Sequence, residues 1–194
     1  MTAQQRILVT GPTRSGKSEW AEALAMQSEL PVVYVATSCD NADDPEWQAR
    51  LTIHRQRRPE HWRTLEVPVD LTAALNTAST TECWLIDSLG TWLANGLEQS
   101  ETEWQETVAL LTTAVSHFSG ILIFVAEETG WGVVPAYPLG RKFRDRLGTL
   151  TRHLGTLCDQ VYLVVAGYAV DLRSIGMPVP HRSTPLKLQN ITTD

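Results

Sequence analysis

The sequence predicts an α/β domain with helices on both faces of a mostly parallel sheet. Continuous apolar runs, which do not alternate with polar residues as half-exposed strands do, predict buried strands at 7–10, 32–36, 84–86, 121–126 and 161–166. Helical patterns lie between the strands, at about 17–27, 45–58, 71–76, 104–118 and 139–157. Because strands that alternate with helices form parallel sheets through crossover connections, this order favours a doubly wound, three-layer arrangement.

Composition and length indicate a single globular domain. The 194 residues are 43% hydrophobic and 20% charged, which excludes a disordered chain. The longest apolar runs have six residues, whereas a membrane-spanning helix needs about 20, and the first residues carry no signal-peptide core. A net charge of −6 argues against a broad nucleic-acid-binding surface. Three widely spaced cysteines without a CxxC pair predict reduced thiols, so we expect a cytoplasmic protein without nucleic-acid or membrane partners.

A phosphate-binding loop joins the first predicted strand to the first helix. The loop matches the pattern G-x-x-x-x-G-K-[ST] at every fixed position: Gly11, Pro12, Thr13, Arg14, Ser15, Gly16, Lys17 and Ser18. Its glycines let successive backbone N–H groups point at phosphate oxygens, at the positive end of a helix dipole. Lys17 is expected to reach the β- and γ-phosphates, and the Ser18 hydroxyl to ligate Mg²⁺. The alternative, an accidental match in a strand-to-helix turn, is disfavoured by the correct flanking elements.

The segment after the second strand gathers basic residues around a histidine. A helix is predicted to start at the Asp-Pro pair 44–45 and to end before Pro59, because proline disfavours helix at the preceding residue. The basic residues that share one face of this helix with His54 are Arg50 and Arg57 or Arg58. In an acidic protein such a cluster indicates an anion, most simply a phosphate chain.

His54 has two interpretations from this pattern. Neighbouring cations favour the neutral imidazole, whose free ring nitrogen can attack phosphorus while arginines stabilise the charge that develops. Alternatively, His54 packs on a surface helix beside Leu51 or Trp47 and has no chemical role. The residue pattern alone leaves both interpretations open.

Acidic residues follow the third and fourth predicted strands. Asp87 ends the strand 84–86 and is a candidate second ligand, with Ser18, for the magnesium of a bound nucleotide. The stretch 127–132, which reads Glu-Glu-Thr-Gly-Trp-Gly, follows the next strand. Open α/β sheets bind ligands at these carboxyl ends, although a solvated acidic turn is a comparable explanation for this stretch.

Three segments together resemble one enzyme family in order and spacing. They are the phosphate loop GPTRSGKS, the stretch EWQARLTIHRQRRPEHWRTLE from Glu46 to Glu66, and the stretch VAEETGWGVVPAYPLGRKFRDRLG from Val125 to Gly148. The chain resembles the bifunctional adenosylcobinamide kinase/adenosylcobinamide-phosphate guanylyltransferases of cobalamin biosynthesis over about residues 6 to 170. The resemblance implies a RecA-like, P-loop NTPase-like fold with a mostly parallel sheet.

The resemblance also implies two reactions and a set of site residues. One reaction phosphorylates the aminopropanol hydroxyl of adenosylcobinamide with ATP or GTP, and the other transfers GMP from GTP to that phosphate through a guanylylated histidine, here His54. Nucleotide contacts beyond the phosphate loop would map to Thr37, Ser38, Arg55, Gln56, Arg57, Arg58, Glu66 and Asp87. Family members form trimers with nucleotide sites near subunit boundaries, so we expect a homo-oligomer that acts on a corrinoid substrate.

Several positions depart from the commoner family pattern. Glu127 takes the place of an asparagine, and Ser88 and Gly90 take the places of a cysteine and a threonine. In the late helix, Thr151 and Arg152 replace an Asn-Gln pair. These departures bear on the corrinoid contacts and on the kinase reaction, while the loop lysine, the strand-end acid and the histidine are retained.

Two other functions compete with the bifunctional enzyme. One is a P-loop kinase of another small-molecule alcohol, in which His54 is structural. The other is a nucleotide-dependent switch, which the absence of an N/T-K-x-D guanine-specificity motif disfavours. We expect one P-loop nucleotide-binding kinase/guanylyltransferase domain over residues 1–172 and a proline-containing C-terminal tail over 173–194.

Overall fold

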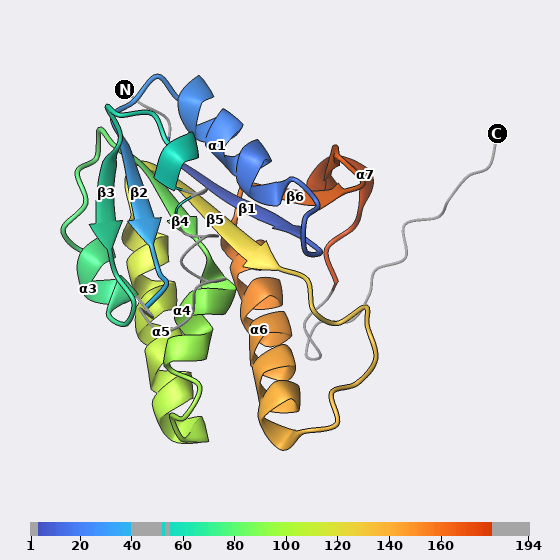
Figure 1. Cartoon of the computed structure of the whole chain (residues 1–194). Coiled ribbons are helices and arrows are strands. Elements are labelled where there is room, and N and C mark those ends of the chain that lie inside the picture. The colour runs from blue at the N-terminus through green and yellow to red at the C-terminus, as the bar shows by residue number, and fades with distance from the viewer. Residues whose placement is uncertain (1–3, 40–51, 53–54, 180–194) are drawn as a thin grey trace.

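A seven-stranded sheet forms the centre of the computed structural model, which describes residues 4–39, 52 and 55–179 (Figure 1). The strand order across the sheet is β3-β2-β4-β5-β1-β6-β7, and among these described strands only the β6–β7 pair is antiparallel. The strands are β1 (Gln5–Gly11), β2 (Val32–Ala36), β3 (Arg63–Glu66), β4 (Cys83–Asp87), β5 (Ile121–Glu127), β6 (Gln160–Val165) and β7 (Tyr168–Asp171).

Helices cover both faces of the sheet (Figure 1). The described helices are α1 (Lys17–Gln27), α3 (Leu71–Leu75), α4 (Leu89–Asn95), α5 (Glu101–His117), α6 (Pro138–Leu157) and α7 (Leu172–Ile175). Helix α1 packs on one face, and α3, α4, α5 and α6 pack on the other. In the described part of the chain, no helix has the length and apolar character that crossing a membrane requires.

Two buried clusters, one on each face, explain why the strands read as continuous apolar runs. Successive residues of a strand point to opposite faces of the sheet. In β1, Ile7 and Val9 pack with Ala21 and Ala25 of α1, whereas Leu8 packs in the cluster beneath the helices of the other face. Both faces of the sheet are therefore buried, as in parallel sheets generally.

Side-chain caps fix where several helices start. Ser100 and Glu103 form a reciprocal capping box at α5, in which the Glu103 carboxylate accepts from the Ser100 N–H at 2.8 Å. These hydrogen bonds lower the pKa of Glu103. Asp70 caps α3 by accepting from the Ala73 N–H, and Pro138 occupies the first turn of α6.

The predicted fold class is confirmed, and the differences concern short elements. All five predicted strands and the helices predicted at 17–27, 71–76, 104–118 and 139–157 are present, with ends shifted by at most three residues. The edge strands β3 and β7 and the helices α4 and α7 were not predicted. Ala166 belongs to the β6–β7 turn instead of the strand, because it has a φ of +51° and precedes Gly167 at +80°.

Two predictions fall largely outside the described residues. Of the helix predicted at 45–58, only residue 52 and residues 55–58 are described, and 52 and 55–57 are helical. Residues 180–194 of the predicted tail are also outside the described part. Its boundary at 172/173 falls within α7, which Arg173 ties to the domain by donating to the carbonyl of Cys158. That boundary stays a prediction.

Candidate active site

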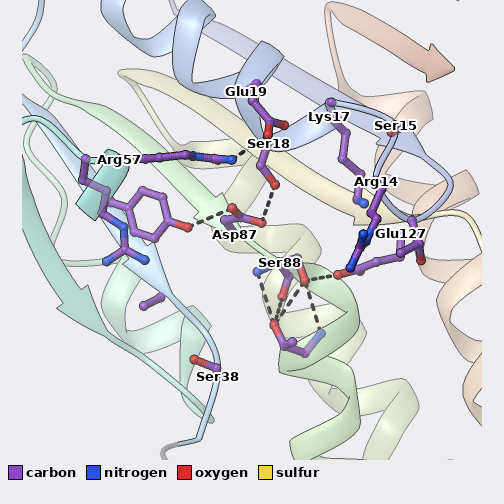
Figure 2. Close-up of a pocket in the computed structure, with 16 residues that line it drawn as sticks. Arg14, Ser15, Lys17, Ser18, Glu19, Ser38, Arg57, Asp87, Ser88 and Glu127 are labelled. Atoms are coloured by element: carbon purple, nitrogen blue, oxygen red, sulfur yellow. Dashed lines mark hydrogen bonds and ion pairs between the residues drawn. The ribbon is translucent and has the colours of Figure 1, made fainter. Parts of the chain in front are cut away.

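The phosphate loop, Asp87 and Glu127 surround one cavity of about 430 Å³ at the carboxyl ends of the central strands (Figure 2). Because β2, β4, β5 and β1 are adjacent and parallel, the segments that follow them meet at the same edge of the sheet. The residues that line the cavity are Thr13, Arg14, Ser15, Gly16, Lys17, Ser18, Glu19, Tyr34, Ala36, Ser38, Arg57, Arg58, Asp87, Ser88, Thr91 and Glu127.

The phosphate loop has the backbone geometry that its glycines permit. Gly16 has a φ of +94° at the N-cap of α1, a conformation that L side chains rarely adopt. At Gly11 a Cβ would overlap the carbonyl oxygen of Val164 in the neighbouring strand β6. The Lys17 ammonium donates to the carbonyl of Pro12 at 3.3 Å, so the side chain folds back over the loop whose bound phosphates it would neutralise.

A buried hydroxyl within the loop has no protein partner. Ser15 is 6% exposed, and among the described residues nothing hydrogen-bonds its Oγ. An unpartnered buried hydroxyl is costly unless a ligand completes its hydrogen bonding. A phosphate oxygen at the loop would accept from Ser15 Oγ and remove that cost.

Asp87 is held by two hydroxyl groups on opposite sides. Tyr34 donates to Asp87 Oδ2 at 2.8 Å. Ser18 Oγ lies 3.5 Å from Asp87 Oδ1 (Figure 2). Burial, together with the nearby Asp87 charge, raises the pKa of Tyr34 well above its ordinary value, which keeps the hydroxyl protonated as a donor.

The Ser18–Asp87 pair suits Mg²⁺. The Ser18 hydroxyl oxygen and the Asp87 carboxylate oxygen are hard ligands, and Mg²⁺ commonly takes one or two protein ligands together with water and substrate phosphates. Within the described part of the chain, no group of three or more histidine, cysteine, aspartate or glutamate side chains gathers. Water and nucleotide phosphates are the usual remaining ligands of such an ion.

The basic segment after His54 packs against this cavity. Arg57 pairs with Glu19 at 2.6 Å and with Glu22 at 2.7 Å, both on α1. The Arg58 guanidinium lies over the Tyr34 ring, 3.6 Å from its centroid. Two successive arginines thus anchor the segment to α1 and β2, beside the phosphate loop.

Several predicted site residues lie apart from the cavity lining or outside the described residues. Arg55 and Glu66 form an exposed ion pair at 3.5 Å, away from the lining residues, and Gln56 does not line the cavity. Thr37 is fully buried, where its hydroxyl donates to the Ser88 carbonyl at 2.7 Å and accepts from the Ser88 N–H at 2.9 Å. His54 and Arg50 are outside the described residues.

Sequence reasoning missed Glu19, Tyr34, Ala36 and Thr91 among the cavity residues. Tyr34 lies inside the apolar run of β2, where its hydroxyl gave no sign of a polar role. Thr91 follows the strand-end acid by four residues, and its spacing from Ser88 is that of a helix cap, which signals local structure.

Comparison with known proteins agrees with this geometry. The family model described as cobinamide kinase / cobinamide phosphate guanyltransferase matches residues 7–172. The chain belongs to this family. Its curated relatives include the bifunctional adenosylcobalamin biosynthesis protein CobP of Pseudomonas aeruginosa, 40% identical over 93% of this chain and 99% of that protein. The corresponding protein CobU of Escherichia coli strain K12 is 35% identical over 86% of this chain and 99% of that protein.

Solved structures support the P-loop NTPase-like fold of this family member. An ATPase from the type III secretion system of pathogenic bacteria has a TM-score of 0.51 at 9% identity, over 90% of this chain and 59% of that chain. At this identity the likeness concerns the fold alone. The family resemblance predicted from the three sequence segments is confirmed.

Proposed function

We propose that this chain phosphorylates adenosylcobinamide and then transfers GMP from GTP to the resulting phosphate, releasing pyrophosphate. The observation that carries the proposal is a complete phosphate loop facing Asp87 across one cavity, in a chain of the cobinamide kinase / cobinamide phosphate guanyltransferase family. The relatives' names, which state bifunctionality and adenosylcobalamin biosynthesis, support the corrinoid substrate.

In this proposal the loop residues hold the triphosphate of GTP or ATP. Backbone N–H groups and Ser15 Oγ donate to phosphate oxygens, and Lys17 neutralises the β- and γ-phosphates. Ser18 and Asp87 would hold Mg²⁺, which offsets phosphate charge when bound. Tyr34 keeps the Asp87 carboxylate in place through its hydrogen bond.

Guanylyl transfer in this proposal uses His54 as the nucleophile. A neutral ring nitrogen forms a bond to the α-phosphorus of GTP while the bond to the pyrophosphate oxygen breaks. A phosphate oxygen of the corrinoid then displaces the imidazole and takes the GMP. The positions of Arg57 and Arg58 on the cavity support this role, because they follow His54 by three and four residues and bring positive charge to the phosphate site.

A homo-oligomer, a trimer by family resemblance, is part of the proposal. Exposed apolar side chains on the loop after β5 and the start of α6 support a covered surface there: Trp131, Val133, Val134, Tyr137 and Leu139. The cytoplasmic location stays a prediction.

Product analysis tests the proposal. The full chain is incubated with adenosylcobinamide, ATP, GTP and Mg²⁺, and the corrinoid products are identified by mass spectrometry. We expect addition of one phosphate and then of GMP, and loss of both with Lys17→Ala. Lys142→Ala is the matched control, because the Lys142 ammonium bonds the Gln99 carbonyl and is not a cavity residue.

Three other outcomes would contradict the proposal in different ways. Phosphorylation without GMP transfer would show that the chain is a kinase and not a guanylyltransferase. Phosphorylation of another small alcohol, with adenosylcobinamide untouched, would replace the substrate. Nucleotide-dependent partner binding without turnover would indicate a switch protein.

A further inference from the structure

Glu127 stands between the phosphate loop and Asp87 at the end of β5. In the register of the sheet, Glu127 is opposite Gly11 of β1, and Val125, two residues earlier, is opposite Asp87 of β4. The Glu127 side chain is half-buried and lines the phosphate cavity. Figure 2 shows Lys17, Asp87 and Glu127 around the same space. A carboxylate here lies beside the position that the terminal phosphate of a bound nucleotide would take.

Two hydrogen bonds from the start of α4 orient the Glu127 carboxylate. Its Oε1 accepts from Ser88 Oγ, and its Oε2 accepts from the Gly90 N–H at 2.9 Å. The backbone is fixed as well, because the next residue, Glu128, donates its N–H to the Gly11 carbonyl at 2.9 Å. A carboxylate has about four acceptor positions, so each oxygen keeps capacity for a further hydrogen bond.

Gly90 provides the space that the Glu127 carboxylate occupies. A Cβ at position 90 would overlap Glu127 Oε2. Ser88 and Gly90 thus hold the Glu127 carboxylate from one side, through a hydroxyl and a backbone N–H, and leave room for it.

The Glu127 carboxylate forms no ion pair within the described residues. The ion pairs found there do not include Glu127, although the lysine and arginine side chains of the phosphate loop line the same cavity. A hydrogen-bonded but unpaired carboxylate is available as a proton acceptor, and it is poised beside the site of phosphoryl transfer.

We propose that Glu127 accepts the proton of the alcohol that attacks the γ-phosphate in the kinase reaction; this inference rests on the proposed function. The alcohol oxygen forms a bond to the γ-phosphorus, and its proton passes to a Glu127 oxygen. The bond between the γ-phosphorus and the β–γ bridging oxygen breaks, and the nucleoside diphosphate leaves. Glu127 later returns the proton to solvent.

Glu127 has no role as a proton acceptor in the guanylyl-transfer reaction. A neutral imidazole attacks with a free lone pair, and the corrinoid phosphate is already an anion, so neither nucleophile loses a proton to a base. Glu127 therefore serves one of the two reactions, which separates a chemical role from a purely structural one.

Glu127→Gln tests the inference with little change in shape. The glutamine oxygen can accept from the Gly90 N–H, and its amide can donate to Ser88 Oγ, because a hydroxyl also accepts. We expect the rate of phosphate transfer from γ-labelled ATP to adenosylcobinamide to fall by about 10²- to 10⁴-fold. Labelling of the chain by α-labelled GTP should change far less than phosphate transfer does.

Gly90→Ala is the second variant, and it displaces the carboxylate without removing it. Alanine is a better helix former than glycine, so α4 itself should tolerate the change. We expect phosphate transfer to fall while the labelling by α-labelled GTP remains.

The outcomes separate this inference from the proposed function. Wild-type phosphate transfer together with an equally active Glu127→Gln variant would overturn the inference alone. A parallel loss of both reactions in both variants would also overturn it, because it would show that Glu127 only secures α4. Absence of phosphate transfer in the wild-type chain would overturn the kinase part of the proposed function and the inference with it.

Discussion

The hydroxyl of Tyr34 donates a 2.8 Å hydrogen bond to the same Asp87 carboxylate that faces Ser18 of the phosphate loop. The Tyr34 ring also lies beneath the Arg58 guanidinium and stacks with Trp62, at 6.5 Å between ring centroids. One buried side chain therefore joins the basic segment after His54 to the carboxylate proposed to hold magnesium. This link makes Tyr34 a positioning residue for the site.

Tyr34→Phe should weaken the site by releasing the Asp87 carboxylate. The substitution keeps the ring and its contacts but removes the donor to Oδ2, a bond worth about 0.5–1.5 kcal/mol of folding free energy. We expect a lower free energy of unfolding by about that amount, and a several-fold higher Mg²⁺ concentration for half-maximal turnover. Urea unfolding and magnesium titration of activity measure the two effects.

Tyr168→Phe is the control for this experiment, because it makes the same chemical change at a side chain that is 77% exposed. It should alter neither quantity. Equal effects of the two substitutions would show that the hydrogen bond to Asp87 does not position the carboxylate.

Arg57→Ala should destabilise the fold more at neutral than at acid pH. Burial raises the pKa of Glu22 above its ordinary value even though Arg57 pairs with it, so the ionised carboxylate is already disfavoured in the folded chain. Removing Arg57 leaves that partly buried charge without its partner and raises the Glu22 pKa further. In the variant, the pKa of Glu22 in the folded chain then lies further above its value in the unfolded chain. The free energy of unfolding therefore falls as the pH rises from the unfolded-state pKa to the folded-state pKa.

Urea unfolding of Arg57→Ala at pH 4.5 and pH 7 measures this dependence. We expect a loss of about 1–2 kcal/mol at pH 7 and a smaller loss at pH 4.5, where Glu22 is increasingly protonated. Arg55→Ala is the matched control, because the Arg55–Glu66 pair is exposed on both sides, at 51% and 69%. A loss for Arg57→Ala that is the same at both pH values would exclude Glu22 as its cause.

Thiol reactivity should divide the three cysteines into one accessible and two protected groups. Burial raises the pKa of Cys83 to about 11 and that of Cys158 to about 12, whereas Cys39 is exposed. An aromatic disulfide reagent at pH 8 should therefore react rapidly with Cys39 alone in the folded chain, and with all three thiols in urea.

Cys39→Ser should remove the rapid phase of this reaction and leave the slow one. Raising the pH from 8 to 9 should not ionise the two buried thiols, because their pKa values lie well above that range. Rapid reaction of Cys83 or Cys158 in the folded chain would contradict the packing of the two clusters in which they lie.

The sequence predicted those features that depend on local patterns. The phosphate loop is a contiguous motif, and the strand before it has a strong apolar signal, so its place between β1 and α1 could be predicted directly. Asp87 was found because a carboxylate ends a continuous apolar strand. Helix α4 was missed because four of its seven residues are buried, which leaves too short and too apolar a stretch to show a helical period.

Contacts that depend on which strands pair, and in which register, could not be predicted from the sequence. Tyr34 and Asp87 are 53 residues apart and meet because β2 pairs with β4. The contact of Glu127 with Gly90 likewise requires β5 to lie beside β4. The edge strands β3 and β7 were missed because each has only four residues, none of them buried.

Covalent labelling tests the central claim, that His54 carries GMP during turnover, most directly. The full chain is incubated with α-labelled GTP and Mg²⁺, denatured, digested and mapped. The proposed mechanism predicts an acid-labile label on the peptide that contains His54. The label should be lost in His54→Ala and kept in His61→Ala, a substitution at an exposed histidine outside the cavity lining. Bound GTP without a stable label, or a label that survives His54→Ala, would contradict the covalent route.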